Sequence, residues 1–308
     1  MIKLMHINDY IIDTSQFNPL LNDKIVDRFE QKIADFVGAK YACSLNSATT
    51  AIFLCLYEKL PMTVSIPSVL PPVVANAILY AGHVVGFRDD VDWVGESYPL
   101  CYFKDYKIID SAQQIYKNQF KEQADDDDIM IFSFYPTKPV GSSDGGMIVS
   151  NDKGKIDRIR ILSRNGMSLE DNSWERKIIL PGWKSYMNSI QAYIANENFK
   201  KLPEKTERFE EIKHQYNQAF GLNNTSNHLY RIRVEDNQNF ISKMREKGIQ
   251  CGVHYKALHL MDYYKTGQEL ELEKSEKEEK ITASIPFHEL LTKTEIKKVI
   301  EEVKKYVQ

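Results

Sequence analysis

Residues 129–150, IMIFSFYPTKPVGSSDGGMIVS, decide how the rest of this chain is interpreted. The stretch opens with four consecutive apolar residues, 129–132, which is the pattern of a strand buried on both faces. Pro139 and the glycines and serines after it exclude a regular helix and are typical of a turn. A second strand follows at 147–150. One lysine, Lys138, is therefore expected in a tight loop at the end of a buried strand. A lone loop lysine is ordinarily a solvated side chain, so its meaning depends on other stretches.

Residues 42–54, ACSLNSATTAIFL, predict a strand that leads directly into an apolar helix. Small polar residues, including Asn46, Ser47 and Thr49, stand where that helix begins. The start of a helix presents unpaired backbone N–H groups and the positive end of the helix dipole, which suits a phosphate group. Ordinary helix capping by Asn46 or Ser47 would explain the same residues.

Residues 106–113, YKIIDSAQ, predict a strand with Asp110 at its carboxyl end. A carboxylate in that place either caps the strand end or pairs with a protonated ring nitrogen of a cofactor. Strand-like segments alternate with helical ones through the first half of the chain, which predicts a mostly parallel α/β sheet. Ligands of such sheets bind at the carboxyl ends of the strands, so Asn46, Asp110 and Lys138 are expected to share one site. The predicted strands are 41–45, 63–66, 83–87, 107–110, 129–133 and 146–150.

Bulk composition is that of an ordinary globular protein. The chain has 308 residues, of which 43% are hydrophobic and 27% charged, with a formal net charge of −3. That charge argues against a general nucleic-acid-binding protein. No apolar run is long enough to span a bilayer and no leader sequence opens the chain, so we expect a cytoplasmic protein without a membrane partner. The four cysteines lack disulfide or metal-ligand spacing, and we expect no metal site.

These stretches together resemble the DegT/DnrJ/EryC1/StrS family of pyridoxal-phosphate (PLP) sugar aminotransferases. Residues 132–138 match the family's lysine motif, F-S-F-Y-P-T-K, letter for letter. Residues 46–49, NSAT, read like its phosphate loop, NSGT, and residues 110–113, DSAQ, fit its D-x-A-Q/H pattern. Further matches follow in the same order along the chain. They are D-G-G-x-I-V at 144–149, R-N-G at 164–166, G-V-H-Y at 252–255 and L-H-L at 258–260.

The resemblance implies a fold-type-I PLP aminotransferase. We expect an α/β fold with a mostly parallel central sheet flanked by helices and a smaller C-terminal α+β domain. Residues 1–200 would form the large PLP-binding domain with its N-terminal segment, and residues 201–308 the small domain, with strands at 229–234 and 250–254. In this family the active site is shared across a homodimer.

The resemblance also implies a role for each matching residue. Lys138 would form the Schiff base with the cofactor and later act as the general base, and Asp110 would keep the ring nitrogen protonated. Gln113 would lie near the ring hydroxyl and Pro71 over the ring face. The remaining candidates form two groups. Three would contact the cofactor phosphate: Ala48, Thr49 and Ser133. Three would contact the substrate: His254, Tyr255 and His259.

The implied reaction converts a nucleotide-linked keto-deoxysugar to an amino sugar, with glutamate as the expected donor. Residues 252–265 contain no arginine that could clamp a free amino acid's carboxylate. Three residues depart from the family pattern: Ala48 replaces a glycine, Pro71 an aromatic residue, and Tyr186 an Asn or Arg. Two alternatives remain open. One is a non-catalytic relative that binds PLP or a nucleotide sugar as a regulator. The other is a PLP-dependent sugar dehydratase, although dehydratases of this kind carry histidine in place of Lys138.

Overall fold

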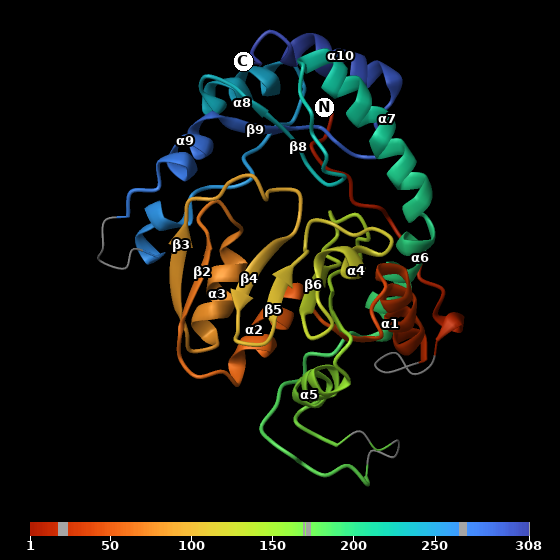
Figure 1. Ribbon diagram of the computed structural model, residues 1–308. Helices are drawn as coiled ribbons and strands as arrows, with labels where there is room; N and C mark the ends of the chain where they lie inside the picture. The colour runs from red at the N-terminus through yellow and green to blue at the C-terminus, as the bar shows by residue number, and fades with distance from the viewer. Residues whose placement is uncertain (18–23, 169, 171–173, 265–269, 308) are drawn as a thin grey trace.

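The computed structural model describes residues 1–17, 24–168, 170, 174–264 and 270–307 (Figure 1). Its centre is a five-stranded sheet in the order β1-β7-β6-β5-β4. The strands in that order are Tyr41–Leu45, Gly146–Ser150, Ile129–Ser133, Lys107–Asp110 and Tyr98–Tyr102. A separate parallel pair is formed by β2 (Thr63–Pro67) and β3 (Val84–Arg88). All six predicted strands of this half are present, whereas β4 was not predicted.

The central sheet is mixed, which corrects the prediction of a mostly parallel sheet. Only β5 and β6 pair in parallel, and the β1–β7, β6–β7 and β4–β5 pairs are antiparallel. Only residues 103–106 connect β4 to β5. A link that short allows a hairpin but not the crossover that parallel neighbours need. The predicted α/β class is confirmed, with a mixed rather than a mostly parallel sheet.

Helices cover both faces of the central sheet, as predicted. Successive side chains of a strand point to opposite faces, and β6 shows the result. Ile129 and Ile131 join a core that includes α2 (Ala48–Tyr57) and α3 (Pro72–Tyr80). Met130 and Phe132 join a second core on the other face. That core includes residues of α1 (Lys24–Val37) and α6 (Ser189–Lys200). Two further helices are α4 (Gln119–Gln123) and α5 (Lys153–Ser163).

The C-terminal part has its own apolar core around the antiparallel pair β8–β9. The long helix α7 leads from α6 into this part (Figure 1). Ile2, at the start of the chain, also packs into this core. The division into domains at residue 200 stays a prediction. The elements of the C-terminal part are α7 (Leu202–Phe220), β8 (Tyr230–Arg233), α8 (Asn237–Glu246), α9 (Glu273–Ile281), β9 (Thr282–Ile285) and α10 (Lys293–Val303). Among all the described residues, short 3-10 helices are formed by Thr14–Gln16, Leu258–Leu260 and Asp262–Tyr264.

The predicted strand at 250–254 is wrong. The partner of β8 is β9, and in the 250–254 segment only Gly252 makes a strand-like bridge, to Ser284. Within the described ranges, no helix is both long and apolar enough to cross a bilayer. The expected cytoplasmic location stays a prediction.

Candidate active site

A cavity of about 560 Å³ opens where β1, β5 and β6 end and α2 begins. This is the edge at which α/β sheets bind ligands. Nine of the ten predicted site residues line the cavity, and His259 does not. The nine are Ala48, Thr49, Pro71, Asp110, Gln113, Ser133, Lys138, His254 and Tyr255.

The loop that carries Lys138 is held by its own backbone. The amide of Lys138 donates to the carbonyl of Tyr135 at 2.9 Å, and the amide of Ser142 donates to the carbonyl of Phe134 at 2.8 Å. A Cβ at Gly141 would lie 2.4 Å from the carbonyl oxygen of Pro136, so this tight return requires glycine. The loop therefore fixes the base of the lysine side chain at the cavity wall.

The amine of Lys138 is buried, and burial lowers its pKa to about 8 because the charged form loses hydration. The negative charge of Asp110 acts in the opposite direction and raises that pKa. The Nζ atom lies 3.3 Å from Nε2 of His228, a contact that joins residues 90 positions apart in the sequence. A lysine with a lowered pKa supplies a larger fraction of neutral amine, the form that attacks a carbonyl group.

Asp110 is a buried carboxylate with both oxygens hydrogen-bonded. Oδ1 accepts from the amide of Ala112 at 2.9 Å, and Oδ2 accepts from the hydroxyl of Tyr98 at 2.8 Å. Burial raises the pKa of Asp110, while these two bonds and the charge of Lys138 lower it. The carboxylate is thus fixed in orientation at the end of β5.

The start of α2 forms another side of the cavity. The Ser47 side chain caps the helix by accepting from the amide of Thr50 at 3.1 Å. The amides of Ala48 and Thr49 lie in the first turn, where the helix itself provides no acceptor for them. Positive φ occurs among the described non-glycine residues only at Asn118 and Asn165. Ala48 therefore replaces the glycine of the family pattern without backbone strain.

Gln113 and Pro71 both line the cavity. Oε1 of Gln113 accepts from the amide of Gly95 at 2.9 Å, which orients its side chain. Pro71 immediately precedes α3 with a φ of −62°. Leu70 and Val74 join Pro71 in an apolar part of the wall.

The predicted substrate-side residues separate into two places. His254 lines the cavity, and its Nδ1 lies 2.9 Å from the Ser284 hydroxyl. Burial lowers the pKa of His254 to about 4, so its ring is neutral near pH 7. His259 is turned away: its ring bonds Ser68 at 2.6 Å and lies 3.5 Å from Glu276. The geometry gives His259 a structural place outside the cavity, because Ser68 and Glu276 occupy its two ring nitrogens.

Sequence reasoning missed three residues of the site: His228, Tyr98 and Trp93. His228 touches Lys138, Tyr98 holds Asp110, and Trp93 lies in the cavity wall. The indole N–H of Trp93 is buried and has no acceptor among the described residues. A buried donor of this kind is ordinarily paired, so a ligand with an acceptor group would satisfy it. The available signal was weak, since only a histidine next to a predicted strand marks His228.

A buried amine, a buried carboxylate and a helix start facing one cavity are the donor set that PLP requires. The sequence matches the DegT/DnrJ/EryC1/StrS aminotransferase family over residues 5–102 and 75–304. The chain belongs to this family. The predictions of the family, of an aminotransferase and of PLP as its cofactor are confirmed.

Relatives of this family member match it along nearly its whole length. The UDP-4-amino-4,6-dideoxy-N-acetyl-beta-L-altrosamine transaminase of Campylobacter jejuni (strain 81-176) is 27% identical over 376 aligned positions, which cover 99% of each chain. Among solved structures, Helicobacter pylori PseC, an aminotransferase of pseudoaminic acid biosynthesis, superposes with a TM-score of 0.80 at 18% identity over 98% of this chain and 99% of that chain. Spr1654 from Streptococcus pneumoniae, in its PLP form, superposes with a TM-score of 0.79 at 17% identity over 98% of this chain and 97% of that chain. The fold-type-I prediction is confirmed.

Proposed function

We propose that this aminotransferase moves an amino group from an amino acid, with glutamate as the expected donor, to a keto-deoxysugar linked to a nucleotide. The observation that carries the proposal is the buried amine of Lys138, with its lowered pKa, in one cavity with the buried Asp110. The Campylobacter relative, a transaminase of a UDP-linked amino-dideoxy sugar, supports this substrate class.

The chain's residues fit the cofactor in the following way. Lys138 would hold it covalently, and the ionised Asp110 would pair with its ring nitrogen. The amides of Ala48 and Thr49, with the Ser133 hydroxyl, would bind its phosphate at the positive end of α2. When bound, PLP supplies an aldehyde that takes the amino group and a ring that withdraws electrons from the neighbouring carbon.

Lys138 is also suited to move the proton that amino transfer requires. Once its amine is released by the incoming donor, it lies in the cavity and can take a proton from the substrate carbon and return it elsewhere. A base works best when its pKa is near the working pH, and the pKa of Lys138 is about 8.

The shape and charge of the cavity favour a sugar over a simple keto acid. Its wall includes Met5, Leu70, Val73 and Trp93, which offer an apolar surface to a deoxysugar. No arginine is found among the described residues that line it. His254 and Tyr255 provide polar groups that could orient sugar hydroxyls. Lys265, the last residue of the arginine-free segment 252–265, lies outside the described residues.

The proposal includes a homodimer with shared active sites. A groove of about 620 Å³ runs along α2 and α3 and is lined by Thr49, Val73 and several aromatic side chains. Thr49 and Val73 also line the main cavity, so a second copy on this groove would contact the site. Tyr80, which also lines the groove, is an exposed aromatic side chain and supports such a contact. Light scattering should give twice the mass of one chain, and a monomer that is fully active would contradict this part.

The substrate test is competitive. Purified enzyme receives PLP, glutamate and either a panel of nucleotide-linked keto-sugars or a panel of free keto acids, and 2-oxoglutarate formation is followed. The proposal predicts turnover with a keto-sugar and little with keto acids. Turnover on keto acids and none on any keto-sugar would contradict it. Loss of the substrate oxygen without consumption of glutamate would instead identify a dehydratase, and a colourless protein that takes up no PLP would indicate a non-catalytic relative.

A further inference from the structure

His228 contacts Lys138 but belongs to none of the sequence motifs that identify the site. His228 lies in the segment between α7 and β8, and its side chain is 4% exposed. Its Nε2 lies 3.3 Å from the Lys138 Nζ, and both residues line the same cavity. His228 is therefore in direct contact with the atom on which the proposed chemistry depends.

Hydrogen-bonding rules fix the direction of this contact whenever the lysine is charged. An ammonium group has three donors and no acceptor, so Nε2 of His228 has to accept and the ring proton has to be on Nδ1. Burial and the nearby Lys138 and His254 hold the pKa of His228 well below its usual range, so the ring stays neutral. The negative charge of Asp110 also acts on Lys138.

We propose that His228 is a catalytic residue of this site, whose neutral ring accepts a hydrogen bond from the charged Lys138 amine. This inference rests on the proposed aminotransferase function. The proton that Lys138 takes from the substrate carbon stays on Nζ, stabilised by His228, until Nζ returns it to the substrate. The ring of His228 gains and loses no proton, and the hydrogen bond holds the amine in one direction between the two transfers.

On one side, hydrogen bonds to Gly95 and Glu96 hold the segment that carries His228. The Ser226 hydroxyl accepts from the amide of His228 at 3.0 Å and donates to the carbonyl of Gly95 at 3.1 Å. Gly95 has a φ of +98°, and a Cβ there would lie 2.6 Å from the Ser226 hydroxyl. Next to Ser226, the Thr225 hydroxyl donates to Glu96 at 2.6 Å.

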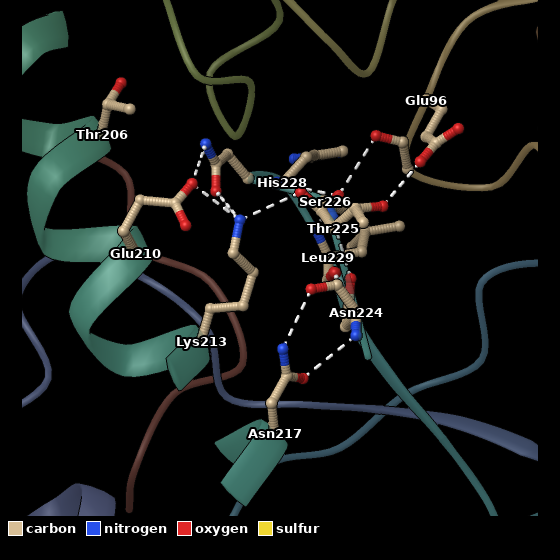
Figure 2. Close-up of polar contacts among 12 residues, drawn as sticks. Glu96, Thr206, Glu210, Lys213, Asn217, Asn224, Thr225, Ser226, His228 and Leu229 are labelled. Atoms are coloured by element: carbon tan, nitrogen blue, oxygen red, sulfur yellow. Dashed lines mark hydrogen bonds and ion pairs between the residues drawn. The ribbon is translucent and has the colours of Figure 1, made fainter. Parts of the chain in front are cut away.

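Helix α7 holds the same segment from the other side (Figure 2). The buried Lys213 amine donates to the carbonyl of Thr225 at 3.0 Å and to Oδ1 of Asn227 at 2.8 Å. Asn217 exchanges two hydrogen bonds with the backbone of Asn224. A segment fixed on both sides presents its histidine in one position, which is what a group that orients an amine needs.

The test measures the pKa of Lys138 in cofactor-free protein, by labelling with acetic anhydride across a pH series and peptide mapping. His228→Leu removes the acceptor and should lower that pKa by about one unit, because a hydrogen bond to a charged group is lost. His228→Gln keeps an acceptor and should stay within about 0.3 unit of the wild-type value. His83→Leu is the matched control. His83 is also 4% exposed, but its ring bonds Met62 and Leu56, away from the cavity.

The labelling requires neither cofactor nor substrate, so it is independent of the proposed reaction. An unchanged Lys138 pKa in His228→Leu would overturn the inference, as would equal shifts in the Leu and Gln variants. With a keto-sugar substrate, the inference further predicts a roughly tenfold lower kcat in His228→Leu and partial rescue in His228→Gln. Wild-type kcat in His228→Leu would overturn the catalytic role. Absence of any keto-sugar turnover in the wild-type enzyme, with the pKa shift present, would instead refute the proposed function alone.

Discussion

Replacing Asp110 by Asn removes one charge from the site while leaving its shape almost unchanged. The amide oxygen of Asn can still accept from the amide of Ala112, which now bonds Oδ1 at 2.9 Å. The Tyr98 hydroxyl, now 2.8 Å from Oδ2, can rotate and accept from the new NH₂ group. We therefore expect Asp110→Asn to fold and to retain some cofactor.

The loss of turnover follows from the lost charge. A neutral amide cannot stabilise a protonated ring nitrogen, and a charge-assisted partner in a dry site contributes on the order of 2–4 kcal/mol. That corresponds to roughly 30- to 1,000-fold in rate. The assay is 2-oxoglutarate formation at saturating PLP and keto-sugar, with Asp105→Asn as the control. Asp105 is an exposed residue on the β4–β5 hairpin. Turnover of Asp110→Asn equal to that of the control would refute this reasoning.

Three further predictions test the surroundings of the site. Tyr98→Phe leaves Oδ2 of Asp110 without its hydroxyl donor, so the pKa of Asp110 should rise and the acid limb of the pH–rate profile should move up by about one unit; an unmoved limb would contradict this. Folding lowers the pKa of Lys138 from 10.5 to about 8. Below pH 8 the lysine is charged in both states, and its buried charge destabilises the cofactor-free fold. Between pH 8 and about 10.5 the unfolded state binds more protons, so the free energy of unfolding rises with pH. Lys138→Met should therefore stabilise that form at pH 7, by up to roughly 3 kcal/mol, with a gain that shrinks above pH 8 in urea unfolding; a gain that grows with pH would have the wrong sign. Gly95→Ala forces a side chain at φ +98° against Ser226 and should cost about 1–3 kcal/mol of stability as well as activity, and a variant as stable as wild type would show that the contact can relax.

Much of the large sheet could be predicted from the sequence because its strands are short apolar runs bounded by turns. Several predicted strands have the same first and last residues as the observed ones: 41–45 for β1, 107–110 for β5 and 129–133 for β6. β4 escaped prediction because Pro99 and an acidic, glycine-containing approach hide its alternation. The relative direction of the strands was also mispredicted, although the four residues between β4 and β5 are too few for the crossover that parallel strands need.

The candidate site was predicted where a motif lies within a few residues of chain. Lys138 and Asp110 follow directly from strand ends, and the structure brings them into one cavity. His228 reaches Lys138 across 90 residues through a segment fixed by α7, and no local pattern encodes that contact. His259 is the converse case, because its neighbours in sequence suggested a cavity position, whereas its ring contacts Ser68 and Glu276.

The central claim is that Lys138 is the residue that holds the cofactor. Enzyme loaded with PLP is reduced with borohydride, digested and mapped by mass spectrometry, with Lys138→Met as the control. The account predicts that the pyridoxyl group is recovered on Lys138 in the wild-type protein and that the control takes no specific label. Recovery of the label on another lysine, with Lys138 unmodified, would contradict the account.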